Sequence, residues 1–250
     1  MLIDPGNVQV HPDPDRAAEA AAEEFGTLAR SAAQAGRPFT VALTGGGSPV
    51  PLYRLLGSEP VARGIPWGNV HLFWGDDRCV PPAHPRSNYR LAAELFIRKV
   101  PIPAGNVHRM PAELGAVEGA ERYERELRAF FSGRYPAFDL VYLGVGDDGH
   151  VASLFPFQLA NLMERERWVL PAIAPEAGEP RVTLSFASIN AAANVRMLLP
   201  AARQSGMVRR LLLGPLDPFR LPAQLVRPRA GVQWWTLTRA SAAALPDPVA

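Results

Sequence analysis

Short apolar runs alternate with amphipathic stretches along the chain, and several of these runs end abruptly in polar, glycine-bearing turns. Residues 38–43, 70–74 and 140–143 have the length and bounds of buried strands. The alanine-rich stretch 15–34 and the charged stretch 113–131 are predicted to be helices. Because strands that alternate with helices form mostly parallel sheets, the pattern predicts an α/β fold. We expect an open, mostly parallel twisted sheet covered by helices on both faces.

Weaker patterns complete the predicted order of elements. Asp13 followed by Pro14 is typical of a helix start, and Gly36 is typical of the end of that helix. Further strands are predicted at 8–10, 168–172, 181–186, 195–199 and 232–238, further helices at 49–57, 89–99 and 201–213, and loops at 58–68 and 75–87. We find neither an internal repeat nor a convincing linker, so residues 1–250 are predicted to form a single domain.

Composition and charge limit the class of protein. Apolar residues make up 48% of the chain, which is enough for a full core and argues against disorder. The 26 basic residues nearly balance 24 acidic ones, for a net charge of +2, and no basic run indicates a nucleic-acid partner. Cys79 is the only cysteine, which indicates a reducing compartment. The N-terminus lacks the features of a signal peptide, and no run of about 18 apolar residues occurs. We therefore expect a soluble, cytoplasmic protein that does not cross a membrane.

Three predicted strands end in turns that carry polar side chains. TGGGS follows the first at 44–48, GDDR follows the second at 75–78, and GVGDDGH follows the third at 144–150. In open α/β sheets, ligands lie just beyond the carboxyl ends of the strands. We predict that these three turns meet and form one site, with His150 as its reactive group.

The glycine-rich turn is suited to an anion. A glycine run between a strand and a helix exposes backbone N–H groups at the helix start, where a phosphate or a developing oxyanion can bind. Thr44 and Ser48 add hydroxyl groups, and the P-loop pattern is absent. A tight turn that binds no ligand is the alternative.

The GDDR turn also has two interpretations. A solvated loop with internal ion pairs would explain Asp76 and Asp77 beside Arg78. An arginine just beyond a strand end can instead bind a phosphate through two parallel hydrogen bonds. Cys79 is expected to be a small buried residue rather than a nucleophile.

The GVGDDGH turn contains the pattern G-x-G-x-x-G, so a dinucleotide site is one hypothesis. Asp147 and Asp148 would repel a pyrophosphate there, and Pro156 comes too early for a good helix after the turn. Acid–base chemistry fits better, because Asp148 can accept a ring N–H from His150, select its tautomer and raise its basicity. No spacing among the histidines and aspartates matches a metal-binding signature, so no metal is predicted.

Taken together, the motifs resemble those of the 6-phosphogluconolactonase family, within the wider group that includes glucosamine-6-phosphate isomerase/deaminase. The matching segments, in the family's order from residue 43 to residue 228, are LTGGGSP, WGDDRCVPPAHPRSNYR, LGVGDDGHVASLFP, PRVTLSFASIN and LPAQLVRP. The resemblance implies a Rossmann-like, glucosamine-6-phosphate isomerase-like fold. It also implies hydrolysis of 6-phospho-D-glucono-1,5-lactone to 6-phospho-D-gluconate in the oxidative pentose phosphate pathway, without a cofactor.

The resemblance further implies roles for particular residues. The catalytic roles fall on His150 and Asp148, and the substrate- and phosphate-binding roles fall on Thr44, Gly45, Gly46, Ser48, Arg78 and Arg181. Four positions depart from the family's usual pattern, and two of them, Thr44 and Ser48, keep a hydroxyl. Gly47 stands where a serine or arginine is usual, so a side chain that could contact the ligand is missing, and Asp77 stands where glutamate is common.

The isomerase branch of the group differs just after the histidine, where it typically reads DGHIAFNEP and supplies a glutamate that assists ring opening. This chain reads DGHVASLFP, so Ser153, Leu154 and Phe155 provide no acid. The comparison favours the lactonase. A glucosamine-6-phosphate isomerase/deaminase activity and a non-catalytic sugar-phosphate-binding protein are the alternatives.

The resulting hypothesis is a hydrolase whose substrate is a small sugar-phosphate lactone. Neutral His150 takes a proton from water as the water attacks C1, backbone N–H groups stabilise the oxyanion, and His150 returns the proton to the ring oxygen. We expect a monomer or small homo-oligomer.

Overall fold

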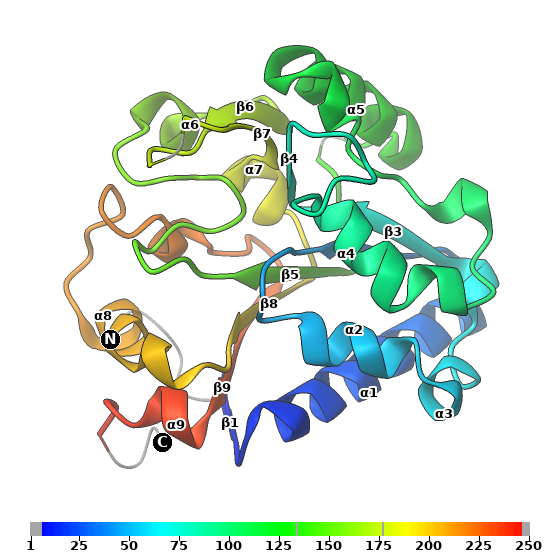
Figure 1. Cartoon of the computed structure of the whole chain (residues 1–250), viewed down its shortest axis with the longest axis horizontal. Coiled ribbons are helices and arrows are strands. Elements are labelled where there is room, and N and C mark those ends of the chain that lie inside the picture. The colour runs from blue at the N-terminus through cyan, green and yellow to red at the C-terminus, as the bar shows by residue number, and fades with distance from the viewer. Residues whose placement is uncertain (1–6, 134, 177, 247–250) are drawn as a thin grey trace.

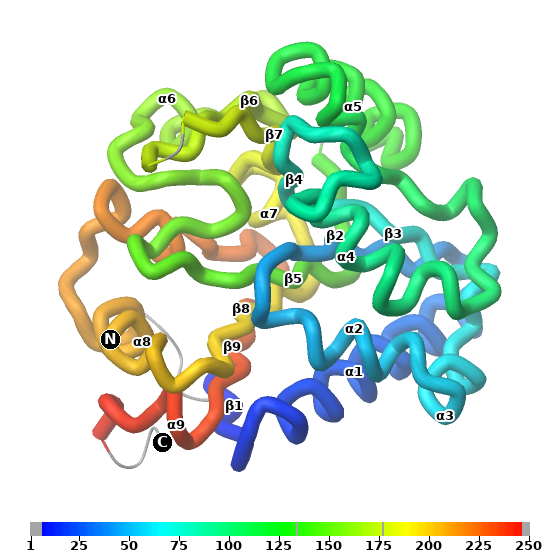
Figure 2. Tube along the Cα trace, viewed as in Figure 1, coloured from blue at the N-terminus to red at the C-terminus, as the bar shows by residue number. Residues whose placement is uncertain are grey.

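The computed structural model describes residues 7–133, 135–176 and 178–246. Within these residues, nine strands form two sheets (Figures 1 and 2). The strands are β1 (Val8–His11), β2 (Phe39–Leu43), β3 (Val70–Trp74), β4 (Asp76–Arg78), β5 (Leu140–Gly144), β6 (Val169–Ile173), β7 (Pro180–Leu184), β8 (Asn194–Leu199) and β9 (Val232–Thr238). Residues 1–6, which belong to the N-terminal stretch without signal-peptide features, lie outside the described residues. That residues 1–250 form a single domain stays a prediction.

The larger sheet confirms the predicted architecture. Its six strands lie in the order β1-β9-β8-β5-β2-β3, and all neighbouring pairs are parallel. Every residue of β2 is buried, as expected for a central strand covered on both faces. Because β5, β2 and β3 are adjacent, the turns that follow them leave the sheet side by side.

Helices cover both faces of this sheet (Figure 1). The α-helices are α1 (Pro14–Gln34), α2 (Val50–Leu56), α3 (Glu59–Ala62), α4 (Asn88–Leu95), α5 (Ala116–Phe131), α6 (Leu159–Met163), α7 (Phe186–Ile189), α8 (Ser205–Leu213) and α9 (Arg239–Ala242). Short 3₁₀ helices are η2 (Trp67–Asn69), η3 (Ile97–Lys99), η4 (Ala104–Asn106), η5 (Ala112–Leu114), η6 (Ala202–Gln204) and η7 (Pro222–Leu225). In the view of Figure 1, α1 and α2 lie below β2 and β5, while α5, α7 and the smaller sheet lie above them. Within the described residues, no helix is both long and apolar enough to cross a bilayer.

Helix α1 begins and ends as its sequence predicts. The Asp13 carboxylate accepts a hydrogen bond from the backbone N–H of Arg16 at 2.9 Å, and Pro14 occupies the first turn, where its missing N–H costs nothing. Gly36 follows the helix with φ +66°, a left-handed conformation that favours glycine. The buried face of α1 consists mostly of alanines, so the helix backbone can lie close to the sheet.

The smaller sheet was not expected, and it corrects the prediction of an irregular loop at 75–87. Strands β4, β7 and β6 form an antiparallel sheet in the order β4-β7-β6, and Arg78 pairs directly with Arg181. The three residues of β4 are all charged, so they show no apolar alternation from which a strand could be recognised. The pairing depends on β7, a partner about 100 residues away in the chain.

Other differences concern short elements. The predicted loop 58–68 contains α3 and the first residues of η2. The predicted helix 89–99 stops at Leu95 and continues as η3, and α6 was not predicted. Elements of three to five residues contain too few positions for a periodic pattern to show.

A pair of histidines joins β3 to the face of α5. Nδ1 of His71 lies 3.1 Å from Nε2 of His108, and Nδ1 of His108 lies 2.9 Å from a carboxylate oxygen of Glu126. The His108 ring stacks on Phe73 with centroids 4.4 Å apart. Burial lowers the pKa of His71 below its ordinary value of 6.5, and the neighbouring His108 lowers it further. Folding therefore favours the neutral form of His71.

This arrangement predicts a loss of stability in mild acid. The unfolded chain binds a proton at His71 more readily than the folded protein does. The free energy of unfolding is therefore highest above the ordinary pKa of histidine, and it decreases as the pH falls below that value. Urea unfolding at about pH 7.5 and about pH 5.5 measures the free energy of unfolding at each pH. Between these two pH values, that free energy should decrease less for His71→Gln than for the unsubstituted protein. Burial also lowers the pKa of His11, so the free energy of unfolding of the variant should still decrease as the pH falls. Equal decreases in the two proteins would contradict this account.

Candidate active site

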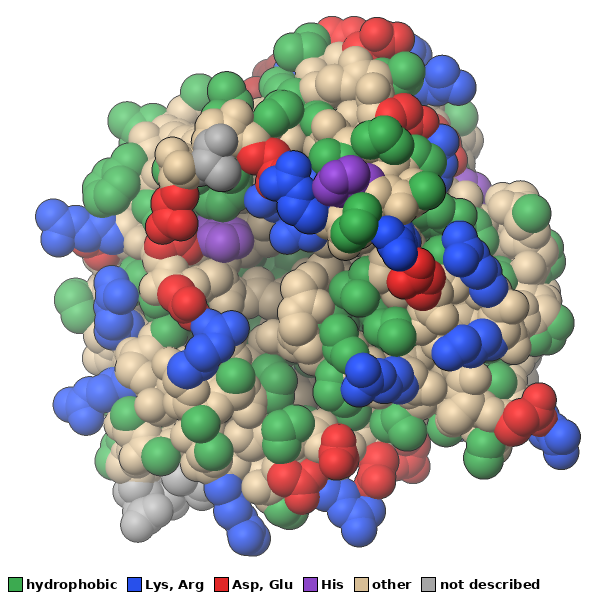
Figure 3. Space-filling view, in the orientation of Figure 1, with side chains coloured by type: hydrophobic (Ala, Val, Ile, Leu, Met, Phe, Trp, Pro, Cys, Tyr) green, Lys and Arg blue, Asp and Glu red, His purple; other side chains and the backbone are tan. Residues whose placement is uncertain are grey.

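The turns after β2, β3 and β5 surround one open pocket. Seven of the eight residues singled out from the sequence line this pocket. The eighth, Asp148, is outside the lining and contacts Nδ1 of His150. The lining consists of Thr44, Gly45, Gly46, Gly47, Ser48, Asp76, Arg78, Asn88, Gly144, Val145, Gly146, His150, Ala152, Arg181, Arg203 and Gln204. Figure 3 shows the hollow in the middle of the face, with basic side chains gathered along its upper edge. The predicted meeting of the three turns is therefore present in the structure.

The glycine turn is shaped by close packing. A Cβ built on Gly45 would lie 1.8 Å from the Oδ1 atom of Asn88, so α4 can approach the turn only because this position is glycine. Gly46 has φ +78°, which also favours glycine. The Thr44 hydroxyl accepts a hydrogen bond from the backbone N–H of Gly144 at 3.3 Å and so joins the ends of β2 and β5. The hydroxyl thus has a structural partner in addition to its place in the pocket.

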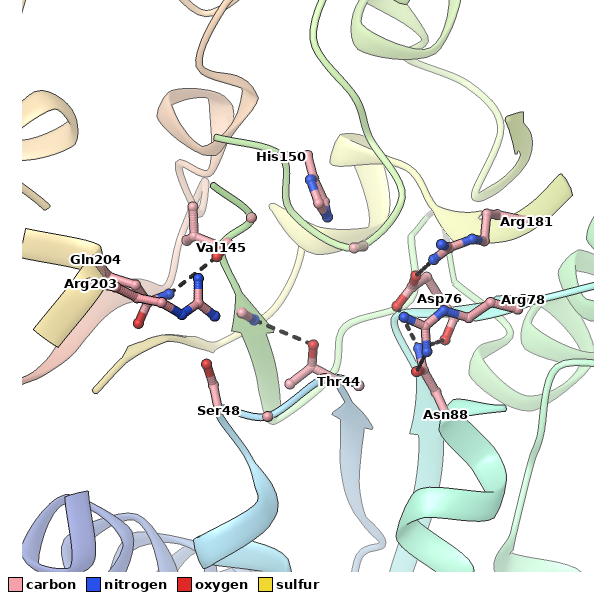
Figure 4. Close-up of a pocket in the computed structure, with 16 residues that line it drawn as sticks. Thr44, Ser48, Asp76, Arg78, Asn88, Val145, His150, Arg181, Arg203 and Gln204 are labelled. Carbon is pink, nitrogen blue, oxygen red and sulfur yellow. Dashed lines mark hydrogen bonds and ion pairs between the residues drawn. The ribbon is translucent and has the colours of Figure 1, made fainter. Parts of the chain in front are cut away.

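One wall of the pocket consists of two arginines (Figure 4). Arg78 donates hydrogen bonds to Oδ1 of Asn88 at 2.6 Å and to the backbone oxygen of Arg86 at 2.9 Å. A guanidinium nitrogen of Arg181 lies 3.8 Å from Oδ2 of Asp76. The Nε atoms of both arginines are buried, and neither has a hydrogen-bond partner among the described residues. A buried donor without a partner is costly, so a ligand that accepts these hydrogen bonds would be favoured.

Two carboxylates hold this wall in place. Asp76 is 5% exposed, and its oxygens accept hydrogen bonds from Ser153 at 2.6 Å and from Asn88 at 3.0 Å. Glu179 forms an ion pair with Arg181 at 2.7 Å. The guanidinium of Arg181 is therefore oriented before any ligand arrives.

Asp77 has a different role from its neighbour Asp76. Its carboxylate accepts hydrogen bonds from the backbone N–H groups of Asn88 and Tyr89, at 2.7 and 3.1 Å, and from the hydroxyl of Ser87. Burial raises the pKa of Asp77 above its ordinary value, although these N–H donors oppose the rise. Asp77 thus stabilises the start of α4 and does not line the pocket.

His150 enters the pocket from the turn after β5. Its Nδ1 lies 2.6 Å from Oδ1 of Asp148, and its ring packs against Phe155 with centroids 4.7 Å apart. A Cβ on Gly146 would lie 2.2 Å from the imidazole, so glycine is needed there. Burial disfavours the charged form of Asp148, but the hydrogen bonds from His150 outweigh this effect and lower the pKa of Asp148 below its ordinary value. An ionised Asp148 selects the tautomer with a proton on Nδ1, which leaves Nε2 as a base.

Sequence reasoning missed several residues of the site. Arg203 and Gln204 lie on η6, on the wall opposite Arg78 and Arg181 (Figure 4). They follow β8 in a segment that carries no glycine run or acidic pair, so the motif search had no signal there. Asn88 also lines the pocket, and it was not assigned to the site from the sequence.

Two other hypotheses can be compared with the structure. Burial raises the pKa of the Cys79 thiol to about 11, so Cys79 is protonated at neutral pH and is a poor nucleophile. Within the described residues, no group of three histidine, cysteine, aspartate or glutamate side chains is placed to hold a metal ion. The predicted lack of a cofactor stays a prediction.

Comparisons with known proteins place the chain beside one family. Residues 12–235 match the family model described as glucosamine-6-phosphate isomerases/6-phosphogluconolactonase. The 6-phosphogluconolactonase of Nostoc sp. is 37% identical over 205 residues, which cover 80% of this chain and 82% of that protein. The 6-phosphogluconolactonase of Synechocystis sp. is 39% identical over 199 residues, which cover 78% of this chain and 80% of that protein. The solved 6-phosphogluconolactonase of Trypanosoma brucei has a TM-score of 0.83 and 26% identity, and the match covers 96% of this chain and 98% of that one.

The packing of the glycine turn predicts that a methyl side chain is tolerated at Gly47 but not at Gly45. Gly45→Ala should force Asn88 away from Arg78 and Asp76 and should lower the free energy of unfolding by about 1–3 kcal/mol. Gly47→Ala is the matched control, because a Cβ there would have no neighbour within 4 Å. Urea denaturation of both variants measures the difference. Equal stability of the two variants would show that the turn does not need glycine at position 45.

Proposed function

The chain belongs to the glucosamine-6-phosphate isomerase/6-phosphogluconolactonase family, and we propose that it hydrolyses 6-phospho-D-glucono-1,5-lactone to 6-phospho-D-gluconate. This is the lactonase step of the oxidative pentose phosphate pathway. The observation that carries the proposal is a basic imidazole nitrogen facing a pocket that is also lined by two arginines, each with a buried Nε–H that has no partner among the described residues.

The phosphate of the substrate binds at Arg78 and Arg181. Both side chains are already oriented by hydrogen bonds and ion pairs, and both keep a buried Nε–H free to donate. A phosphate offers several acceptor oxygens and full negative charge, which suits paired guanidinium groups. The backbone N–H groups of the glycine turn and the hydroxyl of Ser48 complete the cradle.

With the phosphate held there, the lactone ring lies beneath His150. Water attacks C1 while Nε2 of His150 removes its proton, and the C1 carbonyl oxygen becomes an oxyanion. Backbone N–H groups of the pocket other than those that hold the phosphate stabilise that charge. The bond between C1 and the ring oxygen then breaks, and the imidazolium returns its proton to the ring oxygen. The product is the open-chain acid. An ester carbonyl is electrophilic enough for this reaction to need no cofactor.

The isomerase/deaminase alternative would need an acid beside the histidine. Residues 153–155 occupy that region, and they contribute a hydroxyl bonded to Asp76 and a phenyl ring packed on His150. Neither group donates or accepts a proton readily. We therefore expect no turnover of glucosamine 6-phosphate, and a measurable rate with that compound would favour the alternative.

We also propose that the enzyme works in the cytoplasm, as a monomer or small homo-oligomer, without nucleic-acid or membrane partners. The near-even charge balance and the single cysteine support this.

Replacing the base should abolish most of the activity. His150→Ala should lower kcat by at least about 10²-fold with little change in KM, because the imidazole acts in the transition state. A pH-stat follows the acid released from the lactone, after subtraction of spontaneous hydrolysis. His84→Ala is the matched control, since His84 does not line the pocket. Normal turnover by His150→Ala would exclude the proposed role.

Replacing the arginines should weaken binding instead. Arg78→Ala and Arg181→Ala should each raise KM for the phosphorylated lactone by about 10-fold or more, because a charge-assisted hydrogen bond to phosphate is lost. Glucono-1,5-lactone without the phosphate should be hydrolysed about equally by these variants and the unsubstituted enzyme. Arg63→Ala, at an exposed arginine paired with Glu59 on α3, is the control. If KM is unchanged in both pocket variants, the phosphate binds elsewhere.

A further inference from the structure

A second pocket, of about 240 Å³, lies between α6, α7 and the segment that includes η7. Both helices lie above β5 in the view of Figure 1. The second pocket shares no lining residue with the candidate active site. Its apolar side chains are Leu162, Phe186, Ala187 and Leu225, and the first three are almost fully buried. They form a floor that an apolar group can cover.

Three arginines, Arg165, Arg227 and Arg229, complete most of the lining. None of them forms an ion pair with another described residue. The carboxylate of Glu164, next to Arg165 in the chain, instead accepts hydrogen bonds from the backbone N–H groups of residues 165–167 at 2.7 to 3.2 Å. Because the lining contains no acidic side chain, its positive charge attracts an anion.

The guanidinium groups keep hydrogen-bond donors for such an anion. Arg165 uses Nη1 for two backbone oxygens, at 2.9 and 3.0 Å, and its Nη2 lies 3.9 Å from the weakly accepting sulfur of Met163. Arg227 uses only Nε, for a backbone oxygen at 3.2 Å. A guanidinium has five N–H donors, and its planar shape suits the oxygens of a phosphate. The guanidinium of Arg229 lies 4.2 Å from the centre of the Tyr135 ring, which orients its plane.

Asn190 holds the backbone of two of these arginines in place. Its Nδ2 donates to the backbone oxygen of Leu225 at 2.9 Å, and its Oδ1 accepts from the N–H of Arg227 at 2.7 Å. Its backbone oxygen accepts from the N–H of Arg229 at 2.9 Å. Pro228, between the two arginines, restricts its own φ. Binding a ligand here therefore requires ordering of side chains but little ordering of the backbone.

We propose that the second pocket binds a nucleotide, with the base against the apolar floor and the phosphates on Arg165, Arg227 and Arg229. An inorganic anion would leave the apolar floor uncovered, and an uncharged ring would leave the arginines without an acceptor. A nucleotide joins a flat ring to negatively charged phosphates, so it satisfies both parts of the lining. This inference does not depend on the proposed function, because it uses no residue of the candidate active site.

Calorimetric titration with ADP, inorganic phosphate and adenosine, without magnesium, tests the inference. ADP should bind at least about 10-fold more tightly than either of the others, because each of those supplies only one part of the contacts. Absence of ADP binding would overturn the inference. Equal affinities for ADP and inorganic phosphate, or for ADP and adenosine, would overturn it as well, since the pocket would then recognise charge alone or the ring alone.

Variants locate the binding site. Arg227→Gln changes an exposed side chain, so folding should be unaffected, and it should weaken ADP binding by about 10-fold or more. Arg209→Gln, at an exposed arginine of α8 outside the second pocket, is the matched control for the loss of one positive charge. Unchanged ADP binding by Arg227→Gln would overturn the inference. ADP binding that is lost in Arg78→Ala but kept in Arg227→Gln would also overturn it, because ADP would then occupy the candidate active site.

Discussion

The hydrogen bond between Asp148 and His150 is the interaction on which the rest of the site depends. With its Nδ1–H held by a carboxylate, the imidazole has one orientation and presents a basic Nε2 to the pocket. The turn that makes this contact possible requires glycine twice. A side chain at Gly146 would collide with the ring, and Gly149 has φ +89°. The chemistry therefore depends on a tight turn at the end of β5, a strand paired with β2 and β8 in the middle of the sheet.

The charged wall opposite His150 is organised for binding rather than for stability. Burying Asp76 and Glu179 beside arginines costs desolvation energy, which such pairs often recover only in part. The arrangement does orient the guanidinium groups before the ligand arrives, so binding needs little further ordering of side chains. The antiparallel pairing of β4 with β7 is responsible, because it places Arg78 directly opposite Arg181. The parallel sheet thus positions the base, and the smaller sheet positions the anion-binding groups.

Much of this arrangement could be predicted from local patterns. The buried strands end in glycine and acidic turns, and the rule that ligands lie at the carboxyl ends of parallel strands was sufficient to bring 44–48, 75–78 and 144–150 together. The pairing of β4 with β7 could not be predicted, because three charged residues carry no strand signal and the partner is distant in the chain. The same limit applies to Asp77, whose role as a cap for α4 depends on a loop of ten residues folding back. Arg203 was missed because only the three-dimensional path of the chain after β8 places it beside the turn of His150.

The tautomer of His150 decides whether the imidazole can act as a base in the pocket. In protein labelled with ¹⁵N-histidine, the His150 signals can be assigned by their loss in the His150→Ala variant. At a pH where the imidazole is neutral, we expect a protonated Nδ1 and an unprotonated Nε2, and we expect Asp148→Asn to shift this balance. A neutral ring with its proton on Nε2 would contradict the account, because His150 could then not accept a proton from water in the pocket.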